Sequence, residues 1–490
     1  MAKSINHTPA RALWEYRILP GHIGMTSVDD VSLSSPITRY ENGEKPRITL
    51  YNSVISSPMQ AVYSPELNVE LAKLGMISIS NWSQPIAEQA QKRNAVKSRK
   101  GGFVVPDVVS PSTLISELRK LTGKTGYNTY PVTSDGTLNT PMIGIITSND
   151  YRLDFHASAP VSARMIPIEN VVLGRYDEIG YDLTKANRAL IESHHGHLPV
   201  VDKDGKIVYV VFKKDVDEHL QHPYAMMDAS KRYMGGDAVN TVDYEERVPA
   251  LVEAGTDFLY IPTSQADSDY VKQTLEWVAH NFPSMPVGAG NVVTEEGFRF
   301  LADNGAACIG VGMGPGSICI TQEQIGVGRA QGTAIEEVAR ARDEYFREKG
   351  IYVPIIADGG ISTPMHAIIA YALGADAIMG GRIFAGTDES PSEWNSGRSA
   401  KRYWGEGSKR AKEWGVVRYG HGMNTFEEGV EGWVTRQGPV REHMRNFVYT
   451  VKDGMRKGGY MDIPDAHEHA VLEINSEAAL TEGRPHDITL

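Results

Sequence analysis

Short apolar runs rich in Val, Ile and Ala recur along the chain, and each ends in Gly, Asn or Ser. Amphipathic patterns typical of helices lie between most of them, such as TEEGFRFLADNGA (294–306) and TPMHAIIAYALGA (363–375). Continuous apolar strands that alternate with amphipathic helices indicate βαβ units and a parallel sheet. The eight runs are residues 52–59, 76–80, 234–239, 258–263, 286–292, 307–313, 354–360 and 377–381.

Eight strands of this kind predict an α/β fold, and in particular a (β/α)8 TIM barrel. The functional residues of such a barrel lie at the carboxyl ends of its strands. The patches rich in Gly, Asn or Asp within the eight runs fall at those ends. We therefore expect the candidate chemistry to collect at one mouth of the barrel.

The strand order is interrupted by a segment that does not fit the barrel spacing. Within it, YPVTSDGTLNTPMIGIITSNDY (130–151) resembles LPVVDKDGKIVYVVFKKDV (198–216), since both have Pro-Val, an Asp-Gly turn and a β-rich run. Asp-Gly between apolar runs predicts a hairpin, and the shared order favours an internal repeat over two unrelated hairpins. The predicted domains are the first part of the barrel (1–103), the inserted repeat (104–222) and the rest of the barrel (223–490).

Composition narrows the class of protein. The chain is 41% hydrophobic and 22% charged, with a net charge of −12, which argues against general nucleic-acid or acidic-membrane binding. Two cysteines cannot form a disulfide framework, so a reducing compartment is expected. The start MAKSINHTPARALWEY has no apolar signal-peptide core, and we find no membrane-length apolar run. These features predict a cytoplasmic, soluble protein.

A long, weakly periodic segment follows the eighth run, at residues 387–440. Basic residues concentrate in its part GRSAKRYWGEGSKRAKEWGVVRYGHG (397–422), although the whole chain is acidic. This asymmetry favours a lid that contacts an anion over a simple linker. Within it, YWGEGSKR (403–410) offers a Tyr hydroxyl and backbone amides. Arg418 is expected to clamp an anion or form a salt bridge, and on a mobile lid it could instead assist proton transfer.

The loop MGPGSICIT (313–321) places Cys319 on a glycine-rich turn, with Ser317 and Thr321 nearby. Glycines let backbone amides approach an anion, and such amides also activate a thiol. A simple buried cysteine is the alternative, and Cys308, inside an apolar strand, fits that alternative. We therefore expect a nucleophile at the first position and a packing residue at the second.

Two further glycine pairs end neighbouring strands. In IIADGGI (355–361), Asp358 can accept hydrogen bonds from two ribose hydroxyls, and the glycines after it expose amides for a phosphate. IMGGRIFAG (378–386) places Gly381 and Arg382 at the next strand end. Either pair alone could be a tight turn, but their adjacency favours a phosphate site.

Taken together, these motifs resemble the inosine-5′-monophosphate (IMP) dehydrogenase and GMP reductase family. The chain resembles especially the dehydrogenase branch found in Tritrichomonas-type protists and some bacteria. The inserted repeat resembles that family's tandem CBS (Bateman) module, which implies a nucleotide there. The motifs that carry the resemblance are GMGPGSICIT (312–321), GVGRAQ (326–331), ADGGI (357–361), YWGEGS (403–408), RYG (418–420) and FEEGV (426–430).

The resemblance implies oxidation of IMP to XMP with NAD+ and water, the committed step of guanine nucleotide synthesis. A thiol adds to C2 of the purine, hydride passes to NAD+, and water hydrolyses the covalent thioimidate. Carried over by position, Cys319 is the nucleophile and Arg418 the general base, while Thr321 and Tyr419 support proton transfer.

The resemblance also implies ligand contacts and assembly. The family's monovalent cation is K+, which one subunit's cysteine loop binds together with a neighbour's tail, so a homotetramer is expected and octamers stay open. Implied IMP contacts are Ser57, Met59, Asn291, Ser317, Asp358, Gly360, Gly381, Tyr403, Gly405, Glu406, Gly407 and, at the purine edge, Glu428. Implied NAD+ contacts are Thr263, Ser264, Gly312, Met313 and Gly314. Implied cation ligands are Gly314, Gly316 and Cys319, with Glu482 and Gly483 of the neighbour.

The chain departs from the family pattern at three places. Pro262 stands where the family has an Asp that holds the nicotinamide ribose, and Gly310 stands where it has a basic residue. The Thr147 to Asp150 signature of the inserted module is not repeated in its second copy. The alternatives are therefore a GMP reductase, which makes IMP from GMP with NADPH, or a nucleotide-binding paralogue without catalysis. Arg329 and the long lid favour the dehydrogenase over the reductase, and the intact cysteine loop disfavours the paralogue.

Overall fold

The computed structural model describes all residues except 1–4, 100–102, 126, 214–215, 218–220, 396, 398, 414–425 and 486–490. Its contacts divide the chain into two compact units. Unit 1 comprises residues 1–96, 224–226 and 234–490, and unit 2 comprises 97–223 and 227–233. The domain boundaries given by the sequence pattern remain our proposal for the organisation of the chain.

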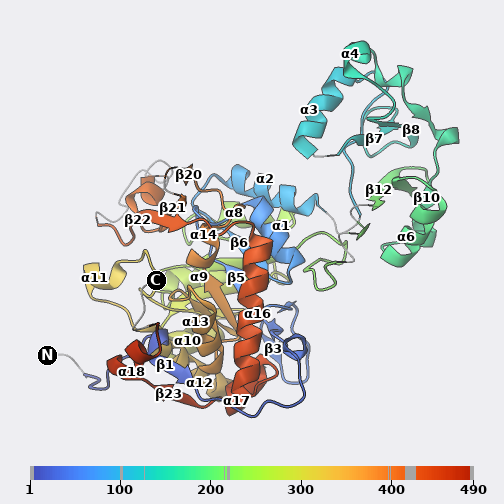
Figure 1. The fold of residues 1–490 in the computed structure, drawn as a ribbon. Coiled ribbons are helices and arrows are strands. Elements are labelled where there is room, and N and C mark those ends of the chain that lie inside the picture. Colours follow the sequence, from blue (N-terminus) through green and yellow to red (C-terminus); the bar gives the residue numbers. More distant parts are fainter. Residues whose placement is uncertain are drawn as a thin grey trace. The chain divides into compact units, whose positions relative to one another are not determined.

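Unit 1 contains the predicted closed parallel barrel, with one strand inside each of the eight apolar runs (Figure 1). Apolar side chains that point outward from the strands pack against the helices in one continuous core. The strands, in their order around the barrel, are β5 (Val54–Ser56), β6 (Ile77–Ser80), β13 (Gly236–Ala238), β14 (Phe258–Pro262), β15 (Val287–Val292), β16 (Ile309–Val311), β18 (Ile355–Asp358) and β19 (Ala377–Gly380).

Helices follow the barrel strands, and several begin at a capping hydroxyl. Ser64 accepts from the Leu67 amide ahead of α1, and Thr294 accepts from the Gly297 amide ahead of α10. The helices of unit 1 are α1 (Pro65–Lys73), α2 (Ile86–Lys97), α8 (Tyr244–Glu253), α9 (Asp269–Asn281), α10 (Glu295–Asp303), α11 (Thr321–Ile325), α12 (Gln331–Lys349), α13 (Pro364–Ala372), α14 (Arg382–Ala385), α16 (Val440–Gly458), α17 (Ile463–His469) and α18 (Glu477–Glu482).

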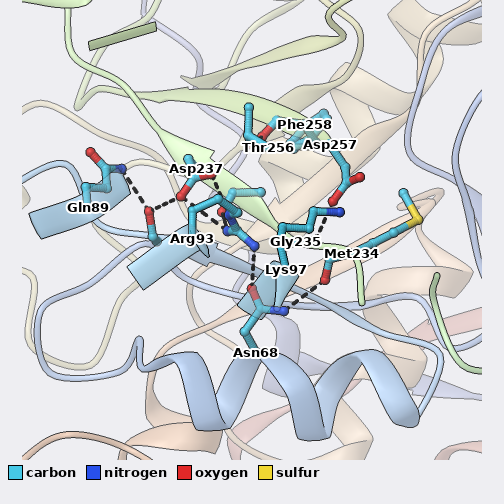
Figure 2. A network of polar contacts seen from close by, with 12 residues as sticks. Asn68, Gln89, Arg93, Lys97, Met234, Gly235, Asp237, Thr256, Asp257 and Phe258 are labelled. Atoms are coloured by element: carbon cyan, nitrogen blue, oxygen red, sulfur yellow. Dashed lines mark hydrogen bonds and ion pairs between the residues drawn. The ribbon is translucent and has the colours of Figure 1, made fainter. Parts of the chain in front are cut away.

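A buried ion pair lies in the barrel wall between α2 and β13 (Figure 2). Arg93 donates to Asp237 at 2.7 Å, and both side chains are fully buried. The same guanidinium reaches the Asn68 amide oxygen at 3.0 Å, while the Ser80 hydroxyl donates to Asp237 at 2.5 Å. The burial of both charges is thus compensated by direct pairing and by hydrogen bonds.

The segment after the barrel, which is weakly periodic in sequence and is predicted to be a lid, contains a sheet in its described part. β20 (Trp394–Asn395), β21 (Ala400–Trp404) and β22 (Glu431–Thr435) pair antiparallel, and β21 and β22 alternate little in hydrophobicity, which explains why the pattern did not reveal them. The remaining strands of unit 1 form two-stranded pairs: β1 (Tyr16–Ile18) with β23 (Leu472–Ile474), β2 (Ser35–Pro36) with β4 (Thr49–Leu50), and β3 (Tyr40–Glu41) with β17 (Ile351–Tyr352).

Unit 2 confirms the two hairpins of the internal repeat. The β7–β8 and β11–β12 pairs are both antiparallel, and each shifts register directly after the Val of its Pro-Val pair, Val132 and Val200. Each Asp-Gly turn has its glycine at a positive φ, +76° at Gly136 and +77° at Gly205. The elements are α3 (Ile115–Thr125), β7 (Thr129–Thr133), β8 (Met142–Thr147), α4 (Leu153–His156), β9 (Ile166–Pro167), β10 (Gly174–Arg175), α5 (Tyr176–Ile179), α6 (Leu183–Glu192), β11 (His197–Val201) and β12 (Ile207–Phe212).

Two features are absent from the described residues. None of their helices has both the length and the apolar content needed to cross a membrane. Within the same part of the chain, no group of three or more His, Cys, Asp or Glu side chains is arranged to hold a metal ion.

Candidate active site

The cysteine loop is joined by backbone hydrogen bonds to residues 428–430, a segment far away in sequence. The Ile320 amide donates to the Glu428 carbonyl at 2.9 Å, and the Val430 amide donates to the Ile318 carbonyl at 3.0 Å. The 428–430 segment is bonded in turn to a third segment, because the Glu428 amide donates to the Gly407 carbonyl at 3.1 Å. Three of the predicted motifs, 313–321, 403–408 and 426–430, therefore meet at one place.

Cys319 is partly exposed on this loop, whereas Cys308 is fully buried. The sulfur of Cys319 lies 3.2 Å from the hydroxyl oxygen of Thr321, which begins α11. Burial raises the pKa of the Cys308 thiol far above its usual range. The contrast predicted between an accessible thiol and a packing thiol is present in the structure.

Asp358 ends β18 and collects hydrogen bonds at the barrel mouth. The Asn291 side-chain amide donates to its carboxyl at 2.9 Å, and the Ser57 hydroxyl also donates to it. Desolvation by burial outweighs these two bonds and raises the pKa of Asp358 to about 6. At neutral pH the group is mainly a carboxylate, so it can accept hydrogen bonds from ligand hydroxyls.

A cavity of about 470 Å³ adjoins this carboxylate's turn. Three glycine-bearing turns line it, at 314–317, 359–362 and 380–382, and Tyr403 closes one side. Gly359 and Gly360 have φ of +88° and +74°, and a Cβ on either would press on Pro315. The turns are therefore packed closely enough to present backbone amides, and the volume is typical of small-molecule sites.

Gly381 lies against Met59 and Tyr403, two other residues that are predicted to contact IMP. A Cβ on this glycine would lie 2.6 Å from the Met59 sulfur and 2.6 Å from the Tyr403 hydroxyl oxygen. Tyr403 also contacts Ser317 through a side-chain hydrogen bond, and burial raises the pKa of Tyr403 well above its usual value. The tyrosine thereby links the β19 turn to the cysteine loop.

Glu406 is held by two donors that the sequence did not single out. The Gln60 amide donates to one carboxyl oxygen at 2.6 Å, and the Ser83 hydroxyl donates to the other at 2.5 Å. Burial is the largest influence and raises the pKa of Glu406 to about 7. The sequence signal that could have revealed Gln60 and Ser83 is their position shortly after β5 and β6, because functional residues of such barrels lie at the carboxyl ends of the strands.

The residues expected to contact NAD+ lie at the ends of β14 and β16. Pro262 is the last residue of β14 and pairs with Gly290. The Thr263 hydroxyl donates to the Gly290 carbonyl at 2.9 Å, while Ser264 is exposed. Gly312 and Met313 are buried beside the loop. Hydroxyl and backbone groups are thus present for a dinucleotide, although Pro262 supplies no carboxylate.

Not all predicted residues meet at the barrel mouth. Arg418 and Tyr419 lie outside the described residues. Glu482 ends α18, and a Cβ added at Gly483, the next residue, would lie 4.0 Å from the Arg17 side chain of the same chain. The Glu428 carboxylate lies 3.9 Å from the Lys412 ammonium.

Gln331 is a further residue that sequence reasoning missed. Its side-chain amide donates to the Val311 carbonyl at 2.8 Å and to the Asp358 carbonyl at 3.2 Å. It therefore ties the ends of β16 and β18 together beneath the site. The sequence signal that could have revealed Gln331 is its position at the end of the motif GVGRAQ (326–331).

A closed parallel barrel carries a partly exposed thiol, a buried carboxylate and glycine-bearing turns at one mouth, which defines a (β/α)8-barrel protein with an enzyme-like site. Residues 14–486 match the model of the IMP dehydrogenase / GMP reductase domain. The chain belongs to this family.

Characterised relatives extend over nearly the whole chain. Inosine-5′-monophosphate dehydrogenase from Tritrichomonas foetus is 39% identical, covering 100% of this chain and 98% of the relative. The Schizosaccharomyces pombe dehydrogenase is 34% identical over 96% of this chain and 90% of its own length. Among solved structures, GMP reductase from Trypanosoma brucei with guanosine 5′-monophosphate has a TM-score of 0.89 at 26% identity, covering 98% of both chains.

Proposed function

We propose that the protein is an NAD-dependent IMP dehydrogenase that converts IMP to XMP. The observation that carries this proposal is the accessible Cys319 thiol 3.2 Å from Thr321, on a loop whose backbone bonds to 428–430, the segment that in turn bonds to 405–407. The dehydrogenase relatives, at 39% and 34% identity, support the direction of the reaction.

In this proposal, the ribose, the phosphate and the purine of IMP each contact a different group of residues in the site. The Asp358 carboxylate accepts from the ribose hydroxyls, and the amides after it, with Gly381 and Ser317, bind the phosphate. Arg382 lines the same cavity and adds positive charge. The purine then lies toward Cys319, over Met59 and beside the 405–407 turn. Glu428 reaches the purine edge.

In the proposed reaction, the Cys319 thiolate bonds to C2 of IMP and hydride leaves C2 for NAD+. Water then attacks C2, the carbon–sulfur bond breaks, and XMP, the Cys319 thiolate and a proton result. The Thr321 hydroxyl takes part in proton transfer near the sulfur. Arg418 and Tyr419 are assigned by resemblance to the activation of water. NAD+ would contact Thr263, Ser264 and residues 312–314.

We further propose K+ as the monovalent cation. The carbonyls of Gly314, Gly316 and Cys319 are a suitable donor set because they carry no net charge and suit a large, weakly hydrated ion. The ligands Glu482 and Gly483 come from a neighbouring copy in this proposal, which requires a homotetramer or a larger assembly. A cytoplasmic location and nucleotide binding by residues 104–222 complete the proposal.

A GMP reductase is the second candidate, favoured by the likeness to the Trypanosoma brucei enzyme. It would use the same thiol and phosphate site but consume NADPH and release ammonia. Parallel assays distinguish the two reactions. The dehydrogenase predicts NADH and XMP from IMP with NAD+, stimulated by K+, and no NADPH oxidation with GMP. The reverse result would select the reductase, and no turnover in either assay would favour a non-catalytic paralogue.

A further inference from the structure

Tyr260 is a fully buried tyrosine in the barrel strand β14. Its neighbours Leu259 and Ile261 belong to the apolar core that packs against the helices. Because side chains alternate along a strand, Tyr260 points to the opposite face, into the barrel. Its ring stacks near Phe258, with centroids 6.5 Å apart.

Glycines on the next two strands make room for this side chain. A Cβ on Gly288 would lie 2.9 Å from the Tyr260 ring, and one on Gly290 would lie 2.5 Å from its hydroxyl oxygen. A Cβ on Gly310 would collide with the same hydroxyl. The tyrosine therefore occupies the space that side chains at these three positions would need, and its hydroxyl is carried across β15 toward the barrel mouth.

At the mouth, the tyrosine is the first member of a chain of hydrogen bonds. Its hydroxyl donates to the Asn291 side-chain oxygen at 3.3 Å, and the Asn291 nitrogen donates to the Asp358 carboxylate at 2.9 Å. A primary amide has one acceptor end and one donor end. A hydroxyl donor on the oxygen and a carboxylate on the nitrogen therefore select a single orientation of the amide.

We propose that Tyr260 is a positioning residue for nucleotide binding: its hydroxyl orients Asn291, which in turn holds the Asp358 carboxylate for the ribose. The inference rests on the proposed function because that proposal assigns Asn291 and Asp358 to the nucleotide. It adds a residue in the barrel interior that has no direct contact with the ligand.

The test removes only the hydroxyl, in Tyr260→Phe, and uses Tyr371→Phe as the matched control. Tyr371 is also a fully buried tyrosine, but its hydroxyl donates to the Ser53 carbonyl, away from the site. We expect the Kd and KM for IMP to rise about 5-fold in Tyr260→Phe, in line with the loss of one buried hydrogen bond. The kcat should stay within about twofold of wild type, and the control should match wild type in Kd.

Ligand-free crystal structures of the three proteins provide a second readout. Asn291 should turn or withdraw from Asp358 in Tyr260→Phe and keep its place in the control. An unchanged Asn291 together with an unchanged Kd for IMP would overturn the proposal. Wild type that fails to turn over IMP would overturn the proposed reaction instead, and the amide orientation would still decide the role of Tyr260.

Discussion

Asn291 and Asp358, 67 positions apart in sequence, share a 2.9 Å hydrogen bond between strands that flank β16. If this carboxylate binds the ribose, Asp358→Asn keeps the shape but loses the charge. Hydrogen bonds to a charged group contribute about 1.5–3 kcal/mol, so the Kd for IMP should rise at least about 10-fold. Isothermal titration calorimetry checks this, and wild-type affinity in the variant would contradict the assignment.

Glu406 predicts a specific dependence of stability on pH. Its pKa is raised from 4.5 to about 7, so the folded protein binds this proton more tightly than the unfolded chain. Stability should therefore fall as the pH rises from about 4.5 to about 7, by at most about 3 kcal/mol. Melting temperatures at pH 5 and pH 8 test it. The melting temperature of Glu406→Gln should rise relative to that of wild type as the pH increases. Melting temperatures that change in parallel with pH in the two proteins would refute the prediction.

The buried Arg93–Asp237 pair predicts a large effect from removing one charge (Figure 2). Arg93→Met leaves the aspartate charged, buried and unpaired, which costs about 3–5 kcal/mol. Arg93→Met combined with Asp237→Asn removes the orphan charge and should recover most of that loss. Thermal denaturation compares the three proteins. Equal melting temperatures for the single variant and wild type would show that the pair contributes little.

Gly310 and Tyr260 predict a non-additive pair of substitutions. Gly310→Ala places a methyl group against the Tyr260 hydroxyl, and overpacking of this kind costs about 1–3 kcal/mol. In a Tyr260→Phe background the same alanine should be tolerated better, because the hydroxyl is gone. A double-mutant cycle on melting temperature measures the coupling. Additive effects would mean that the two positions do not share this space.

The barrel could be predicted from the sequence because its signal is local. Runs such as 354–360 are apolar up to Asp358 and then end in glycine, a pattern typical of a parallel strand that is covered on both faces. The hairpins of residues 104–222 were equally readable from their Asp-Gly turns. The sheet of β20, β21 and β22 was missed because short strands with polar residues on both faces leave little periodicity.

The candidate site was predictable only where a residue carries recognisable chemistry in a recognisable loop, as at Cys319 and Asp358. Ser83 and Gln60 hold Glu406 from segments with no motif of their own, and only the closure of the barrel brings them together. Gly310 could be recognised in the sequence as a departure from the family pattern, but the structural reason for a glycine there lies on another strand. Only the packed structure shows that Tyr260 fills its space.

The central claim is that Cys319 performs the oxidation of IMP, and the two cysteines provide a matched pair of variants. NADH formation from IMP and NAD+ in the presence of K+ should fall at least about 1000-fold in Cys319→Ala. Cys308→Ala removes the buried thiol beside β16 and should keep kcat close to that of wild type. Undiminished NADH formation in Cys319→Ala, or equal losses in the two variants, would contradict the account.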